Sequence, residues 1–166
     1  MNPAAREFVA RAFSEATIAV QDAQATTRPP LSIALLDVAG VALVNQWFGR
    51  SGGDLLLRAF EDWLHVHTER GETVWRLGGD EYLLLMPHRS ARSSTRRLKS
   101  LHRRMGSEPV RLTTMDSLVQ TSVKAMSFHA GGATAPPTAC TAWDLCSMAG
   151  RALQQAERRN RLIIWA

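Results

Sequence analysis

The 166-residue chain lacks long hydrophobic runs and contains only two cysteines. Its apolar stretches are far shorter than the roughly 20 residues that span a bilayer, and its amino-terminal stretch carries acids and no signal-like apolar segment. Cys140 and Cys146 have no histidine cluster nearby, so neither a disulfide framework nor a zinc site is indicated. Repeats and low-complexity tracts are also absent from the sequence. We therefore expect a soluble, cytoplasmic protein that does not insert into a membrane.

The composition favours one globular domain with an anionic ligand. Hydrophobic residues make up 45% of the chain, which is enough to bury a continuous core, so we expect a single domain over residues 1–166. The formal net charge is +5 and the pI is about 10.2. Most of the excess positive charge is arginine in two runs, residues 89–104 and 151–161.

In the first basic run, Leu98, Leu101 and Met105 recur at helical spacing, which predicts an amphipathic helix. Most of its arginines and lysines lie off that apolar stripe, as is typical of a solvated basic face. Phosphate contacts through these cations leave a basic nucleic-acid-binding module as an alternative. No aromatic platform or reading helix accompanies the charge, so nucleic acid is not the partner that the sequence favours.

The order of elements predicts the fold class. Segments with apolar residues at helical spacing alternate with short runs typical of strands. The expected fold is an α/β single-domain sandwich whose central, largely antiparallel sheet is flanked by helices. The expected helices cover Val9–Val20, Val41–Phe48, Asp54–His67 and Trp143–Arg158, and the expected strands cover Leu31–Val38, Glu72–Trp75, Tyr82–Met86, Val119–Phe128 and Leu162–Trp165, with Gly131–Pro137 as a flexible loop.

The most informative segment is Arg76–Tyr82, in which two glycines and two acids lie between the expected hairpin strands. Gly78 and Gly79 allow a ligand to approach the backbone closely, while Asp80 and Glu81 supply oxygen ligands of the kind that Mg²⁺ prefers. This pattern predicts a phosphate and metal site on a hairpin. A plain Gly-Gly turn with charged residues is the alternative interpretation.

A second segment, Leu35–Asp54, has further positions of interest at fixed spacing, namely Asp37, Asn45, Gly49, Gly53 and Asp54. Together with Arg76–Tyr82 and with the closing segments Arg151–Leu153 and Arg159–Arg161, it resembles the GGDEF family over nearly the whole chain. Members of that family are diguanylate cyclases and their inactive relatives. The resemblance implies a nucleotide-cyclase-like α/β fold. It also implies conversion of two GTP molecules into cyclic di-GMP and two pyrophosphates, in a symmetric homodimer whose halves each hold one GTP.

The resemblance implies a metal and catalytic centre. Asp37 and Asp80 would hold Mg²⁺ together with the main-chain carbonyl of Val38. Glu81 would assist beside the metal, and Arg76 would neutralise phosphate charge during transfer. From the residues alone, a strand-end aspartate such as Asp37 is equally a turn former or helix cap, and Arg76 a surface strand residue.

The resemblance also implies a guanine site. Asn45 and Asp54 would recognise the base, because an amide and a carboxylate pair with its carbonyl and N–H edge. Gly78 and Gly79 would make room for the substrate. The alternatives are that Asp54 is an N-cap and that Asn45 ends a helix before Gly49.

Several positions depart from the family pattern. The second aspartate of the family's Asp-Ile-Asp is Ala39, and a lysine that grips the triphosphate is Ala42. A second such lysine corresponds to Glu157 or to Gln155, depending on the alignment. We therefore expect a degenerate domain that binds GTP, cyclic di-GMP or a protein partner with little or no turnover. An active diguanylate cyclase is the alternative.

The family's inhibitory site is an Arg-x-x-Asp motif placed before the glycine turn. Here Arg70 keeps the arginine, while Thr73 replaces the acid. We therefore expect this inhibitory site to be degenerate.

Overall fold

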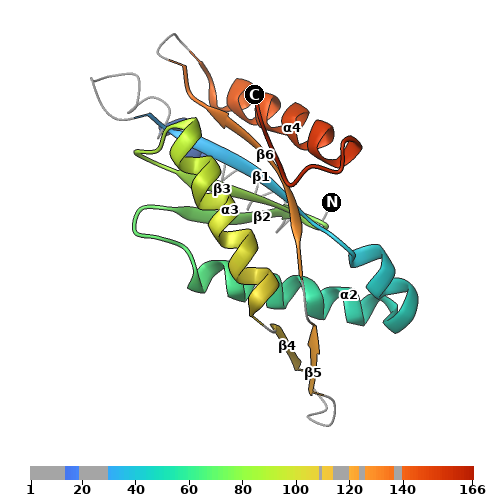
Figure 1. The fold of residues 1–166 in the computed structure, drawn as a ribbon. Helices are drawn as coiled ribbons and strands as arrows, with labels where there is room; N and C mark the ends of the chain where they lie inside the picture. The colour runs from blue at the N-terminus through green and yellow to red at the C-terminus, as the bar shows by residue number, and fades with distance from the viewer. Residues whose placement is uncertain (1–13, 19–29, 109, 114–119, 124–125, 137–139) are drawn as a thin grey trace.

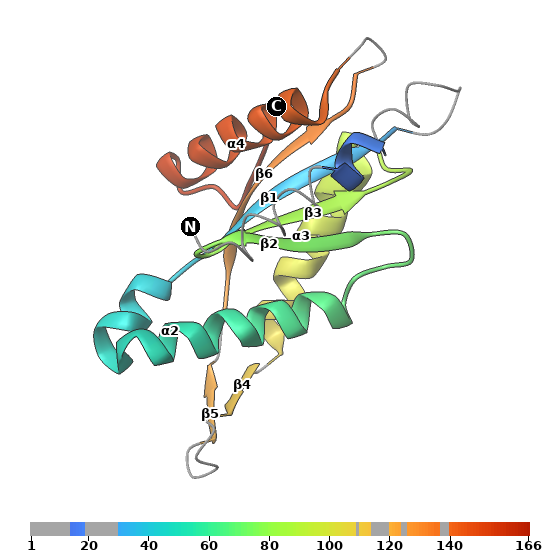
Figure 2. The same cartoon turned by 180° about the vertical axis from the view of Figure 1, so that it is seen from behind.

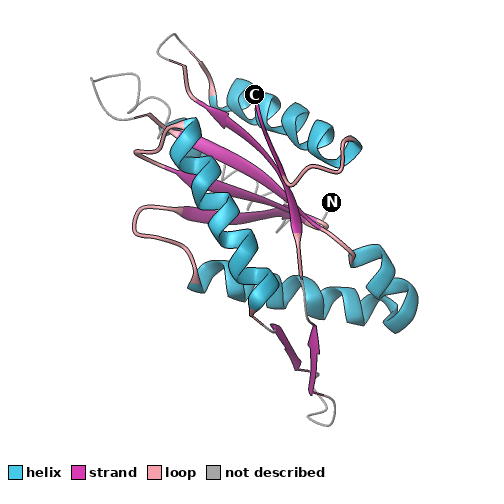
Figure 3. Cartoon of the chain, viewed as in Figure 1, coloured by secondary structure: helices cyan, strands magenta, loops and turns pink. Residues whose placement is uncertain are grey.

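The computed structural model describes residues 14–18, 30–108, 110–113, 120–123, 126–136 and 140–166. Within these residues a five-stranded sheet lies between helices (Figures 1 and 3). The elements are β1 (Ser32–Val38), α2 (Val41–Val66), β2 (Thr73–Gly78), β3 (Glu81–Met86), α3 (Ala91–Ser107), β4 (Val110–Thr113), β5 (Gln120–Val123), β6 (Phe128–Thr134), α4 (Ala142–Arg158) and β7 (Ile163–Trp165).

The strands of the main sheet run in the order β2-β3-β1-β6-β7. Neighbouring strands are antiparallel except β6 and β7, which are parallel. β4 and β5 pair separately as a two-stranded sheet. The predicted α/β class with a largely antiparallel central sheet is therefore confirmed.

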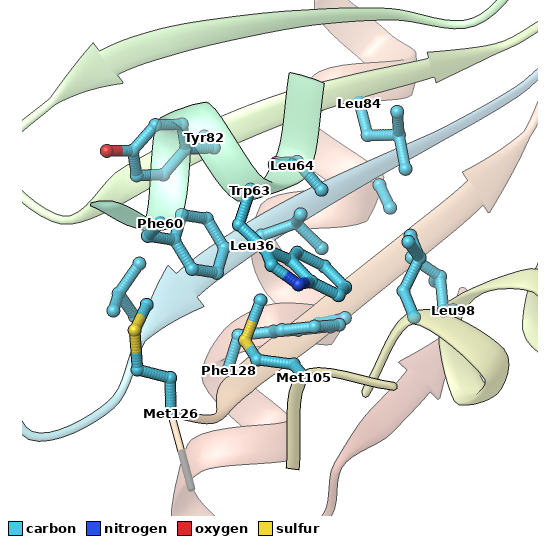
Figure 4. Close-up of a cluster of buried hydrophobic side chains, with 14 of the residues drawn as sticks. Leu36, Phe60, Trp63, Leu64, Tyr82, Leu84, Leu98, Met105, Met126 and Phe128 are labelled. Atoms are coloured by element: carbon cyan, nitrogen blue, oxygen red, sulfur yellow. The ribbon is translucent and has the colours of Figure 1, made fainter. Parts of the chain in front are cut away.

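Side chains alternate across the sheet and form one hydrophobic cluster on each face. Leu36 of β1 belongs to the cluster that includes apolar residues of α2 and α3, whereas Ile33 belongs to the cluster that includes those of α4. α3 lies in front of the strands in Figure 1 and behind them in Figure 2. In the first cluster, the Phe60 ring packs against Tyr82 and Phe128, with centroids 4.9 and 6.1 Å away (Figure 4). Hydrophobic packing against helices therefore stabilises the sheet on both of its faces.

The predicted loop over Gly131–Pro137 is wrong for its first four residues, because β6 runs through Thr134, whereas Pro137 lies outside the described residues. A Cβ atom added at Gly131 would lie 2.0 Å from the Leu153 nitrogen and 2.2 Å from the Ala149 oxygen. The glycine is therefore needed because the backbone of α4 comes very close to β6. Glycine in a strand commonly marks such an approach, which composition alone cannot distinguish from a loop.

The single strand predicted over Val119–Phe128 is also wrong. β5 covers only Gln120–Val123, and β6 begins at Phe128. Val119 and Lys124 lie outside the described residues. β5 pairs with β4, whereas β6 belongs to the main sheet. The alternation of apolar residues in the sequence does not show where one strand ends and the next begins, so the two were predicted as one strand.

The remaining predictions agree closely with the structure. Residues 14–18 are helical, while Val9, Phe13 and Val20 of the same predicted helix lie outside the described residues. The two helices expected on either side of Gly49 form the single element α2, which is kinked where Gly49 takes φ 70° and ψ 178°. None of the helices in the described part of the chain is long and apolar enough to cross a membrane.

Candidate functional site

The end of β1 and the turn of the β2–β3 hairpin are tied together by their main chains. The N–H of Val38 donates a hydrogen bond of 3.1 Å to the carbonyl oxygen of Asp80. The turn itself depends on Gly78 and Gly79, whose φ angles of 153° and 55° are ones that other residues rarely adopt. The sequence therefore folds so that Asp37 and Asp80 belong to neighbouring parts of one site.

A row of titratable side chains crosses three strands at this point. Asp37 of β1 stands opposite Glu81 of β3 on one side and opposite His129 of β6 on the other. Directly paired residues of antiparallel strands point to the same face. The His129 ring nitrogen Nδ1 lies 2.9 Å from the carbonyl oxygen of Arg161, which can only accept, so Nδ1–H donates.

The site is electrostatically negative. The pKa of Asp37 is raised from 3.8 to about 6, chiefly by burial and then, in decreasing order, by the charges of Asp80, Glu157 and Glu81. His129 acts in the opposite direction. Three neighbouring acids disfavour the ionised form of the Asp37 carboxyl group, and a bound cation would favour that ionised form.

The donor set fits a magnesium ion of the kind that keeps waters or substrate oxygens. Asp37 and Asp80 would offer carboxylates, and Val38 would offer its main-chain carbonyl. No group of three or more His, Cys, Asp or Glu side chains in the described ranges is arranged to hold a metal by itself. Mg²⁺ is usually bound by one or two carboxylates plus substrate phosphates, so two carboxylates are sufficient. Such an ion supplies charge neutralisation at a phosphorus centre.

Arg76 braces the hairpin turn. Its Nε and Nη2 donate hydrogen bonds of 3.0 and 2.7 Å to the carbonyl oxygen of Gly79. Its guanidinium carbon lies 5.9 Å from the centre of the Tyr82 ring. The Tyr82 side chain is fully buried and donates through its hydroxyl to the carbonyl of Leu57 at 3.1 Å. Arg76 therefore shapes the turn that carries Asp80, and its role toward phosphate stays a prediction.

The expected guanine-binding residues lie on either side of the α2 kink. Asn45 and Asp54 are both exposed, and both lie within α2, so Asp54 does not act as an N-cap and Asn45 does not end the helix. A Cβ atom at Gly53 would lie 2.1 Å from the Asn45 side-chain oxygen. Gly53 therefore leaves room for the Asn45 amide beside the backbone that leads into Asp54. Their role toward guanine remains a prediction.

Arg70 lies in the turn that precedes β2, at the opposite end of that strand from the glycine turn. Its side chain is exposed, as is that of Thr73. The nearby acid, Glu72, is buried and accepts hydrogen bonds from Arg97 at 2.8 to 3.2 Å. Glu72 is therefore engaged in the core and does not replace the missing acid of the inhibitory motif.

The expectation that the cations of the first basic run form a solvated face is wrong for Arg97. Its side chain is only 9% exposed, and it also donates to the carbonyl of His67. Glu69 shares the network through Arg97 at 3.2 Å and through Arg89. Helical spacing alone put Arg97 with the solvent-facing cations, because it sits at the margin of the apolar stripe.

Two residues of the site were not resolved by sequence reasoning. His129 gave no signal, because a single histidine in a strand is recognisable only from its register opposite Asp37. The alignment left Glu157 and Gln155 open. The charge of Glu157, in α4, contributes to raising the pKa of Asp37.

The fold and the site together define an α/β domain with an acidic centre where a strand end meets a glycine turn. The chain belongs to the GGDEF family, because the family model described as "Diguanylate cyclase, GGDEF domain" matches residues 8–162. This is the family of domains of cyclic di-GMP signalling, as the resemblance implied.

Known proteins agree with this assignment. The diguanylate cyclase DgcP of Escherichia coli (strain K12) is 38% identical over 55 residues, which are 33% of this chain and 16% of DgcP. The chain therefore spans only a small part of that relative. The GGDEF domain of PA1120 from Pseudomonas aeruginosa has a TM-score of 0.82 at 25% identity, covering 95% of this chain and 94% of that one. The GGDEF domain of DgcB from Caulobacter crescentus, solved with c-di-GMP, has a TM-score of 0.78 at 19% identity, covering 92% and 86%.

Proposed function

We propose that this chain is a degenerate GGDEF domain, which binds a guanine nucleotide with Mg²⁺ at the Asp37–Asp80 centre and turns it over little or not at all. The observation that carries the proposal is the effect of Glu157 on Asp37. Glu157, one of the two positions that align with the family's second lysine, is negatively charged and raises the pKa of a carboxylate that a metal and a triphosphate would both approach. Ala42 removes the second expected cation.

The retained residues support binding. Asp37 and Asp80 meet at the sheet end, and Asn45 and Asp54 are exposed on both sides of the kink in α2. Hydrogen bonds to charged groups contribute about 1.5 to 3 kcal/mol each. Losing two of them weakens the hold on a triphosphate by on the order of a hundredfold or more if the effects add. Binding through the base and the metal can survive such a loss better than in-line attack, which needs the phosphates held in alignment.

A calorimetric titration of the 166-residue chain with GTP and Mg²⁺ tests the nucleotide half of the proposal. We expect weak, saturable binding that tightens at least tenfold in Glu157→Lys. Asp62→Lys, an exposed acid on α2, has the same change in charge and is the matched control. Tightening to the same degree in both variants would contradict a local role for Glu157. No heat in any variant would leave a protein partner as the ligand of the domain.

The alternative function is an active diguanylate cyclase that works as a homodimer. Retention of Asp37, Asp80 and Glu81 favours it, with Arg50 or the arginines near Arg159 as replacement cations. Product formation from GTP and Mg²⁺ at high protein concentration, read by mass spectrometry beside Asp80→Ala, separates the two functions. Cyclic di-GMP that disappears in the Asp80→Ala variant would establish turnover. Its absence in the unchanged chain would favour the degenerate domain.

A further inference from the structure

One face of α3 carries a straight row of cations. Arg92, Arg96, Lys99 and Arg103 follow one another at spacings of four, three and four residues. At 100° per residue they fall within an arc of about 60°, and at 1.5 Å per residue the row is about 16 Å long. These four residues are called the α3 row below.

The α3 row points away from the protein. The buried residues of the helix, including Leu98, Leu101 and Met105, lie on the opposite side and pack in the hydrophobic cluster beneath α3. Arg97, the cation closest to that side, is the one that pairs with Glu72. All four side chains of the row are exposed. Because α3 is fixed to the sheet by its other face, the row is a rigid feature of the surface.

The α3 row is not neutralised within the described residues. α3 contains no acidic residue, and none of the four cations takes part in a hydrogen bond or an ion pair there. Three acids on segments next to α3 are engaged with other partners. Glu69 and Glu72 bind Arg89 and Arg97, and Glu108 accepts from the Trp63 indole at 2.8 Å.

We propose that the α3 row binds the phosphate backbone of a nucleic-acid duplex without reading its sequence. A rigid, regular row of cations matches a regular row of phosphates in charge. Contact with a polyelectrolyte releases its condensed counterions, so charge alone is sufficient for binding. Three of the four cations are arginines, whose planar guanidinium suits phosphate oxygens.

The composition of the row argues against the other polyanions. An acidic protein segment would form exposed ion pairs, which individually contribute little, and α3 exposes no large apolar side chain to support them. Membrane attachment usually needs a second, apolar anchor besides basic residues. The apolar side of α3 is buried in the core and cannot supply that anchor. The sequence alone did not favour nucleic acid, because no aromatic platform or reading helix accompanies the charge. Contact with the phosphate backbone needs neither of them.

The test is the salt dependence of binding to a fluorescent duplex of about 20 base pairs with mixed sequence, followed by anisotropy. If the α3 row contacts four phosphates, the logarithm of affinity falls against the logarithm of salt concentration with a slope of about −3.6. Affinity should then fall about 150-fold between 50 and 200 mM salt. A second duplex of unrelated sequence should give the same curve.

Two variants with equal net charge locate the site. Arg92→Gln/Arg96→Gln/Lys99→Gln/Arg103→Gln should lose the slope and most of the affinity. The control Arg58→Gln/Arg104→Gln/Arg151→Gln/Arg158→Gln removes four exposed cations outside the row and should keep the slope. The same test can be made with fewer changes in two double variants, Arg92→Gln/Arg96→Gln and Lys99→Gln/Arg103→Gln. Each double variant should lose about half of the salt-dependence slope. Circular dichroism checks that both variants are folded.

Three results would overturn the proposal. The first is no binding to either duplex at 50 mM salt. The second is equal loss in the row variant and the control variant, which would mean that net charge and not the row is responsible. The third is retention on phosphatidylserine vesicles, lost in the row variant, without retention on the duplexes.

Discussion

The main-chain N–H of Val38 lies 3.1 Å from the carbonyl oxygen of Asp80, and this hydrogen bond fixes the end of β1 against the turn of the β2–β3 hairpin. Asp37 and Asp80 are therefore held at the same end of the sheet by backbone geometry. Preorganisation of this kind would allow the proposed degenerate site to present its acidic centre without the family's lysines.

Asp37 should make stability depend on pH. Its pKa is raised from 3.8 to about 6 in the folded chain, so the folded state binds more protons than the unfolded state between those values. Stability from this group is consequently lost as the pH rises through that window, and the penalty is complete above about pH 6. Asp37→Asn should raise the free energy of unfolding at pH 7.5 by about 1 to 2 kcal/mol after allowance for solvent screening, and by much less at pH 4.

Urea unfolding with a chelator present, at both pH values, measures this effect. Asp62→Asn, on the exposed side of α2, is the control and should change stability by the same small amount at each pH. A gain for Asp37→Asn that does not depend on pH would contradict the assignment.

Arg97 should be indispensable to the core. Arg97→Ala leaves the buried Glu72 carboxylate without its main partner, which typically costs about 3 to 5 kcal/mol. Arg96→Ala, one position away on the exposed side, should change stability by about 0.5 kcal/mol or less. The difference in urea midpoint between the two variants measures the contribution of the inward side chain. Similar midpoints would show that the ion pair is dispensable.

Gly131 and Gly150 should respond in opposite ways to alanine. At Gly131 the added Cβ would meet α4 backbone atoms at 2.0 and 2.2 Å, so β6 and α4 must separate, which costs on the order of 2 to 3 kcal/mol. At Gly150, within α4, the Cβ would meet only Leu35 Cδ1 at 3.7 Å. There alanine should stabilise by about 0.5 to 1 kcal/mol, because it lowers the entropic cost of forming the helix. Thermal unfolding of Gly131→Ala and Gly150→Ala measures both effects. A Gly131→Ala variant that is more stable than the unchanged chain would contradict the close approach of β6 and α4.

Tyr82 should contribute through its hydroxyl as well as its ring. Tyr82→Phe removes the buried hydrogen bond to the Leu57 carbonyl while keeping the packing on Phe60. The expected loss of stability is about 0.5 to 1.5 kcal/mol. Chemical denaturation measures it, and an unchanged or higher midpoint would mean that the hydroxyl is not needed. Tyr82→Leu, which also removes the ring, should cost clearly more.

Most of the secondary structure could be predicted because its signals are local. The apolar strand before Asp37, the glycine turn at Gly78 and Gly79, and the capped helix after Thr141 are each specified by residues close together in the chain. Predictions of secondary structure were wrong where the same local sequence pattern is compatible with two different structures. Gly131 was interpreted as a loop residue because composition does not reveal that a helix backbone passes within contact distance of it.

The sequence by itself determined the family, the order of elements and the residues that could make a metal and guanine site, because motifs and periodicity are properties of neighbouring residues. Only the tertiary structure decided which carboxylates act on one another and which arginine turns inward. Asp37 and Glu157 come together through strand register and the docking of α4, and Arg97 reaches Glu72 because α3 packs beside the start of β2. Contacts between distant residues depend on packing across the whole sheet, and no short window of sequence contains that information.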